Sequence, residues 1–198
     1  MVKISTTNIT FLSGQKISFR PYESNDAELI FKWFNDPVVT HYMFTGQRPK
    51  TVEQIRLLIE KSVNEDENVI FVVSDKKTNR PIGLVGLYEI DSATRKAEMR
   101  IIIGNRKYWG KGYGTEITEL INYYGFDRLN LNRIYLGVTH ENKGAIRVYE
   151  KAGYKREGVL KEDIYRNSRY YDSVRMGLLR DDYYKSIYKK HKAKFLME

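Results

Sequence analysis

A short glycine-rich stretch has the composition of an anion-binding turn. Gly110, Gly112 and Gly114 follow an apolar run at 98–103, which reads as a strand, and precede apolar residues at helical spacing. Between a strand and a helix, such glycines expose backbone N–H groups, and the helix dipole adds partial positive charge. Lys111 contributes a full charge. The turn could therefore hold a phosphate, although alternating glycines also occur in purely structural turns.

The turn does not match the most familiar phosphate-binding motifs. No Gly-Lys-Ser/Thr sequence closes it, as a P-loop requires, and the dinucleotide fingerprint is incomplete. This argues against a kinase and against a simple dehydrogenase.

A second block, residues 142–154, places a tyrosine on the next expected helix. Asn142 stands where a helix N-cap would, while Ala145 and Tyr149 share one helical face. Each residue also has a structural interpretation, as a capping amide or as an ordinary core side chain. An anion-binding turn followed by a proton donor indicates group transfer from a phosphorylated carrier.

Together the two blocks resemble the GCN5-related N-acetyltransferases (GNAT). That family's acetyl-CoA site has a Gln/Arg-x-x-Gly-x-Gly/Ala turn, similar to residues 109–114, and an Asn-x-x-Ala-x-x-x-Tyr-x-x-x-Gly-Phe/Tyr block, which residues 142–154 match without gaps. Trp109 departs from the Gln or Arg of the family. The Trp-Gly-Lys-Gly-Tyr turn and the Trp-Phe-Asn-Asp-Pro sequence at 33–37 look like the branch of ribosomal-protein, spermidine and amino-sugar N-acetyltransferases. The resemblance covers residues 16–180.

The resemblance implies direct acetyl transfer from acetyl-CoA to an amine, through a tetrahedral intermediate and without a metal. Backbone groups of 101–103 would pair with the pantetheine arm, and amides of 109–115 would hold the pyrophosphate. The implied cofactor residues are Ile101, Ile102, Ile103, Trp109, Gly110, Lys111, Gly112, Tyr113, Gly114, Thr115, Asn142 and Ala145. Tyr149 would protonate the departing thiolate, which benefits from a nearby acid because a thiol pKa is about 8.5.

An amine attacks a thioester only when it is neutral, so a group should accept its proton. Glu98, on the strand before the turn, is the leading candidate. On a strand it shares a face with Arg100, so a structural ion pair with Arg100 or Arg95 is equally open. A water chain could also accept the proton, and Glu89 and Glu116 are further candidates.

The acceptor site is expected between the first helices, the loop at 38–50 and the segment that joins the last two strands. Its predicted lining consists of Trp33, Tyr42, Phe44, Arg48 and Tyr88, together with Glu98, Tyr165 and Tyr171.

Three classes of acceptor fit this lining to different degrees. Aromatic side chains with Arg48 favour a nucleotide-linked amino sugar, with the arginine near a phosphate; a protein N-terminus comes second. A polyamine would need several converging carboxylates. The acidic residues available for this are Glu23, Asp26, Glu28 and Asp36. A non-catalytic acyl-CoA-binding module is the alternative outside the enzymes.

Strands and helices that would position these residues alternate along the chain. Strands are expected at 16–20, 69–74, 82–90, 97–103, 134–139, 154–160 and 170–178. Helices are expected after caps at Ser24 and Thr51, after the glycine turn, at 145–152 and from 181 to about 194. The fold prediction is one α+β, GNAT-like domain at 16–180, with a mixed, mostly antiparallel sheet flanked by helices. An N-terminal extension (1–15) and a basic C-terminal helix or tail (181–198) would flank it.

Composition narrows the function classes further. Among 198 residues there is no cysteine, which excludes disulfides, thiolate metal sites and a cysteine-borne acetyl-enzyme. Three scattered histidines make a histidine-rich metal site improbable. No stretch approaches a transmembrane helix and no signal peptide is recognisable, so we expect a cytoplasmic protein without a membrane partner.

A formal net charge of +9 favours acidic partners such as phosphorylated cofactors. Much of the charge lies near the end of the chain, in Lys185, Lys189, Lys190, Lys192 and Lys194. A solvated helix face explains this cluster, and a nucleic-acid partner is not expected. The expected partner is a small-molecule or peptide amine, and the terminal helix could pack between the subunits of a homodimer.

Overall fold

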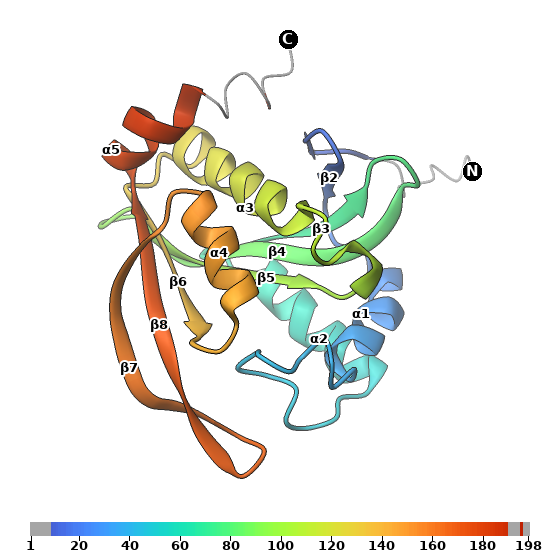
Figure 1. The fold of residues 1–198 in the computed structure, drawn as a ribbon. Coiled ribbons are helices and arrows are strands. Elements are labelled where there is room, and N and C mark those ends of the chain that lie inside the picture. Colours follow the sequence, from blue (N-terminus) through green and yellow to red (C-terminus); the bar gives the residue numbers. More distant parts are fainter. Residues whose placement is uncertain (1–8, 190–194, 196–198) are drawn as a thin grey trace, which may run out of the picture.

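The computed structural model describes residues 9–189 and residue 195, so Lys190, Lys192 and Lys194 of the basic tail lie outside the described residues. Within the described part, an eight-stranded sheet has the order β1-β2-β3-β4-β5-β6-β8-β7 (Figure 1). The strands are β1 (Leu12–Ser13), β2 (Ile17–Arg20), β3 (Val69–Asp75), β4 (Arg80–Asp91), β5 (Lys96–Ile103), β6 (Arg133–Thr139), β7 (Lys155–Arg166) and β8 (Arg169–Leu179). Every neighbouring pair is antiparallel except β5 with β6, which confirms the prediction of a mixed, mostly antiparallel sheet.

Helices cover both faces of this sheet (Figure 1). They are α1 (Ala27–Phe34), α2 (Val52–Val63), α3 (Tyr113–Tyr123), α4 (Lys143–Lys151) and the single turn α5 (Arg180–Asp182). Shorter 3₁₀ turns occur at Ser24–Asp26 and Arg106–Tyr108, and π-helical turns at Tyr124–Arg128 and Tyr183–Ile187.

Two apolar cores follow from the alternation of side chains along the central strands. Leu87 and Met99 point to one face and pack in a cluster with residues of α3 and α4. Leu84 and Ile102 point to the other face and pack with residues of α1 and α2. The sheet therefore separates an α3/α4 side from an α1/α2 side.

The sheet opens between β5 and β6. These two parallel strands pair over only three positions, the last of which is Glu98 with Tyr135. Beyond it, β5 continues to Ile103 beside β4, while β6 continues to Thr139 beside β8. Since no strand within the described residues pairs with the far side of β5 at 101–103, a ligand could enter between the two strands.

Local capping agrees with the sequence at one helix and differs at another. Thr51 caps α2 by accepting the Gln54 amide, as predicted. The prediction for Ser24 is wrong, because its hydroxyl donates to Glu60 at 2.8 Å. The Asp26 carboxylate instead accepts the amide of the residue before Ser24 and binds Arg20, which fixes this turn.

Two further elements differ in extent from those expected. Leu12–Ser13 pairs with β2, so the segment predicted to precede the domain contributes a short strand to the sheet. The last hairpin is longer than its sequence pattern, since β7 runs on to Arg166 with shifts of register against β8. Those shifts interrupt the alternation of apolar residues, which is why the pattern ends early.

Within residues 9–189, no helix is both long and apolar enough to cross a membrane.

Candidate active site

The glycine turn has a backbone that depends on glycine. Gly110 and Gly112 have φ values of +70° and +83°, in the left-handed region that other residues rarely adopt. Gly112 is the N-cap of α3, and the Glu116 amide makes the first bond of the helix, to the Gly112 carbonyl at 3.2 Å. The amides that precede Glu116 at the start of α3 are therefore available to an anion.

The framework beneath the turn fixes its position. Lys16 Nζ donates to the Lys111 carbonyl at 3.1 Å, and the Lys16 amide donates to the Glu116 carboxylate at 2.8 Å. Tyr113 donates its hydroxyl proton to Asp75 at 2.7 Å, and this hydrogen bond raises the pKa of Tyr113 to about 12. Glu116 is buried and bound to backbone, which favours a structural role over that of a base.

Trp109 bridges the turn and the end of β5. Its indole N–H donates to the Ile103 carbonyl at 2.8 Å, and 41% of the residue is exposed. The side chain at this position therefore ties the turn to the open edge of the sheet. This contact gives a structural reason for a tryptophan where the resembling family has glutamine or arginine.

Asn142 and Tyr149 lie on α4, which packs against α3. The Asn142 amide oxygen accepts the Ala145 N–H at 3.1 Å, so it caps the helix and leaves its NH₂ group free to donate. Tyr149 is 8% exposed, and burial raises its pKa above the ordinary value. Among the described residues no group hydrogen-bonds the Tyr149 hydroxyl. It is a protonated phenol with an uncommitted donor, as a general acid requires.

Glu98 is engaged in an ion-pair network on the other side of the sheet. Arg100 Nε donates to Glu98 at 2.7 Å, while a second guanidinium nitrogen lies 3.0 Å from Glu89. The guanidinium also lies over the ring of Tyr88, 4.6 Å from its centre. Burial raises the pKa of Tyr88 to about 12. The structural pair with Arg100 is thus present, and a role of Glu98 as base stays a prediction.

The segment 38–50, which we call the acceptor loop, forms no helix or strand. Tyr42 and Phe44 are 38% and 51% exposed, and Arg48 is exposed as well. Trp33 is different: it is 5% exposed and its ring lies against Gly104, where an added Cβ would come within 2.0 Å of it. We therefore assign Trp33 to the α1/α2 core, from which it supports the backbone leading to the glycine turn.

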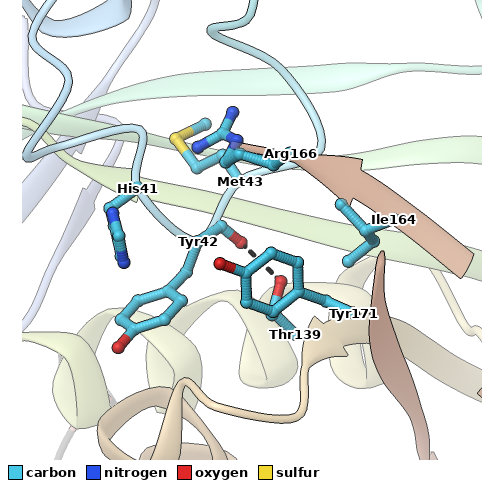
Figure 2. Close-up of a pocket in the computed structure, with 7 residues that line it drawn as sticks. All are labelled: His41, Tyr42, Met43, Thr139, Ile164, Arg166 and Tyr171. Carbon is cyan, nitrogen blue, oxygen red and sulfur yellow. Dashed lines mark hydrogen bonds between the residues drawn. The ribbon is translucent and has the colours of Figure 1, made fainter. Parts of the chain in front are cut away.

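Figure 2 shows a small pocket between the acceptor loop, the end of β6 and the β7–β8 hairpin. Its lining consists of His41, Tyr42, Met43, Thr139, Ile164, Arg166 and Tyr171. Of these, Tyr42 and Tyr171 were predicted from the sequence. Arg166 was missed because the strand was expected to end near 160, and nothing local marks Thr139 at the end of β6.

A family model described as an acetyltransferase (GNAT) domain matches residues 16–155. The chain belongs to the GNAT family. It is an N-acetyltransferase with acetyl-CoA as cosubstrate, and the GNAT match includes the glycine turn, the open edge of β5 and Tyr149.

Relatives of known name are similar over nearly the whole chain. The spermidine N(1)-acetyltransferase of Escherichia coli K12 is 34% identical over 171 residues, covering 86% of this chain and 90% of that protein. A probable N-acetyltransferase of Bacillus subtilis is 31% identical, covering 86% and 98%. The crystal structure of spermidine N-acetyltransferase from Vibrio cholerae with CoA and spermine has a TM-score of 0.78 and 34% identity, covering 85% of this chain and 98% of that one.

In this GNAT fold the two proton-transfer candidates lie on opposite faces of the sheet. Tyr149 belongs to the cluster that contains Met99, on the α3/α4 side. Side chains alternate along β5, so Glu98 lies on the α1/α2 side, which the acceptor loop also borders. The strands part just beyond Glu98, so their opening lies between the face that carries Tyr149 and the face that carries Glu98.

No cluster of three or more His, Asp or Glu side chains within the described residues could hold a metal ion.

Replacing Glu98 by glutamine tests its role as base. We expect kcat/KM to fall about tenfold or more near neutral pH, with the rate profile moved to alkaline pH, because the amine must then lose its proton without help. Glu89→Gln is the matched comparison, since it removes the other carboxylate on Arg100 and also tests the further base candidate; if Glu98 is the base, Glu89→Gln should leave the profile unchanged. A pH–rate profile of Glu98→Gln that equals the profile of the parent enzyme would show that Glu98 only holds Arg100.

Proposed function

We propose that this GNAT enzyme acetylates the primary amine of a small molecule that also carries negative charge, such as a nucleotide-linked amino sugar. The observation that carries this proposal is the charge of the acceptor loop. Between 38 and 50 it contains His41, Arg48 and Lys50 but no aspartate or glutamate. A cationic loop attracts a phosphate-bearing acceptor and repels a polycation.

Two of the four carboxylates that a polyamine site could use, Asp26 and Asp36, are engaged in ion pairs, as is Glu98. Asp26 binds Arg20 at 2.6 Å, Asp36 lies 3.8 Å from Arg106, and Glu98 binds Arg100. Each is neutralised within its own pair, and the pairs lie on separate elements. This arrangement supports an acceptor other than a polycation.

In the proposed reaction the chain supplies positioning and two proton transfers. Amides at the start of α3, with Lys111, would hold the pyrophosphate, and the edge of β5 at 101–103 would pair with the pantetheine arm. The amine attacks the thioester carbonyl, and Glu98 or water takes its proton. Tyr149 gives its proton to the departing thiolate, so the products are the amide and free CoA.

A polyamine acceptor is the second candidate, and the names of the relatives favour it. The E. coli and V. cholerae proteins are spermidine acetyltransferases, at 34% identity. A protein N-terminus remains the third.

An acetyl-CoA turnover assay that reports free thiol separates these acceptors. We expect a nucleotide-linked amino sugar to have a kcat/KM at least about tenfold above that of spermidine, with the difference shrinking at high salt because charge attraction is screened. Arg48→Gln should reduce this preference, whereas Arg80→Gln, which removes an exposed charge at the start of β4, should not. A higher kcat/KM for spermidine would instead establish the polyamine function. Stabilisation by acetyl-CoA without turnover of any amine would favour a binding module.

We further propose that the enzyme acts in the cytoplasm on a small-molecule or peptide amine.

A homodimer is also proposed, with α5 and the helical turn after it between the subunits. β7 is an exposed edge strand of the sheet, so it offers a second surface for such contacts.

A further inference from the structure

The acceptor loop is attached to its surroundings through its backbone carbonyls. Thr139, at the end of β6, donates its hydroxyl proton to the Tyr42 carbonyl at 2.8 Å (Figure 2). Gln47 donates its side-chain amide to the Tyr165 carbonyl of β7 at 2.8 Å. Since the loop has no regular structure, these contacts decide where its side chains lie.

Arg166 makes the strongest of these attachments. Its guanidinium donates to the carbonyls of Thr40 and Thr45 from two different nitrogens, so one side chain spans six residues of the loop, Thr40 to Thr45. Arg166 is 9% exposed, and within the described residues no aspartate or glutamate forms an ion pair with it. Its charge is therefore directed at the loop backbone.

A buried guanidinium without a carboxylate is costly in free energy unless other groups satisfy it. Here the two carbonyls do so, in a forked geometry that the compact ammonium group of a lysine cannot reproduce. The contact thus requires arginine and requires the loop in this conformation.

The attachment leaves the aromatic side chains Tyr42 and Phe44 of the loop exposed. While the carbonyls of Thr40, Tyr42 and Thr45 face the framework, Phe44 is 51% exposed. Its ring also approaches β6, because a Cβ added at Gly137 would lie 3.4 Å from it. Fixing the backbone therefore holds an aromatic side chain beside the opening between β5 and β6.

We propose that Arg166 is a positioning residue that latches the acceptor loop to the β7–β8 hairpin and thereby sets acceptor affinity. This inference rests on the proposed role of residues 38–50 in receiving the acceptor. Loss of the latch should weaken acceptor binding and leave acetyl-CoA binding intact. The two hydrogen bonds of Arg166 go to Thr40 and Thr45, and not to the glycine turn or α4.

Arg166→Met keeps the bulk and removes the forked donor, and Arg166→Lys keeps the charge alone. Both should raise the acceptor KM about tenfold, because two charge-assisted hydrogen bonds are lost, with kcat changed less. CoA affinity, measured by calorimetry, should stay within about twofold of the parent value. Arg156→Met is the matched control, since it removes an exposed guanidinium from the same strand.

Chymotrypsin provides a readout that does not depend on activity. Cleavage after Tyr42 or Phe44 should be about tenfold faster in both Arg166 variants than in the Arg156 control, because the loop opens more often. Thr139→Val, which removes a single bond to the loop, should give a smaller acceleration and serves if the Arg166 variants do not fold.

Two outcomes would overturn the proposal in different ways. Unchanged cleavage in the folded variants would show that Arg166 does not latch the loop. Faster cleavage with an unchanged KM for both a nucleotide-linked amino sugar and spermidine would show that the latch exists but that the loop does not receive the acceptor. The second result would also refute the acceptor-loop part of the proposed function, while leaving N-acetyltransferase activity itself untouched.

Discussion

Replacing Tyr149 by phenylalanine should lower kcat about 100-fold or more, because a positioned general acid contributes at least that much to a reaction of this type. The hydroxyl has no partner among the described residues, so its removal breaks no hydrogen bond of the fold. Stability and acetyl-CoA affinity should therefore stay close to the parent values. Stopped-flow turnover gives kcat, calorimetry of CoA binding gives the affinity, and thermal unfolding gives the stability.

Tyr154→Phe is the control for this variant. Its ring lies 6.1 Å from that of Tyr149 in the same buried cluster, but its hydroxyl already donates to Asn122 at 2.7 Å. Its loss should cost stability, about 1–3 kcal/mol, because the Asn122 oxygen is left unsatisfied. The folded fraction should retain its kcat. An unchanged kcat in Tyr149→Phe at every pH tested would refute the assignment of the acid.

The pH dependence of the Tyr149 step has a definite sign. Burial raises the pKa of Tyr149, so the phenol stays protonated below that raised value and the acid remains available at neutral and moderately alkaline pH. Any loss of rate on the acidic side must then come from protonation of the amine or of its base. A fall of kcat between about pH 8 and 9 that Tyr149→Phe abolishes would contradict this order.

The backbone turn and the helix of the proposed donor half could be predicted from the sequence because short local patterns encode them. A left-handed backbone at Gly110 and Gly112 favours glycine, and the spacing of Asn142 and Tyr149 places both at one helix. Such requirements involve neighbours in the chain, so the residue types alone reveal them.

The acceptor half depends on contacts between distant parts of the chain. Arg166 forms hydrogen bonds with residues more than 100 positions away. Register shifts in β7 interrupt the alternating pattern that would have indicated its strand. The burial of Trp33 against Gly104 likewise joins elements about 70 residues apart, where a side chain lining the acceptor site was expected. Neither contact leaves a local pattern, so the acceptor loop could be located in the sequence but its attachment could not.

Replacing Gly112 by asparagine or by aspartate, two side chains of nearly the same shape but different charge, tests whether the turn binds the pyrophosphate. Asparagine and aspartate tolerate the left-handed conformation better than other side chains, and a Cβ at Gly112 would contact only Lys16 Nζ, at 3.6 Å. Both variants should therefore fold, and Gly112→Asp should be at least as stable as Gly112→Asn because its carboxylate can pair with Lys16. Their melting temperatures check this point.

The affinities of the two variants for CoA should nevertheless differ in the direction opposite to their stabilities. A carboxylate about 5 Å from a phosphate charge is repelled by about 3 kcal/mol at an effective dielectric constant of about 20, before salt reduces the repulsion. We therefore expect calorimetry to show that Gly112→Asp binds CoA roughly tenfold to 100-fold more weakly than Gly112→Asn, with the gap narrowing as salt rises. Equal affinities would mean that the pyrophosphate lies elsewhere and that the glycines serve only the backbone. If Gly112→Asp is at least as stable as Gly112→Asn but binds CoA more weakly, the negative charge of CoA lies directly beside the turn.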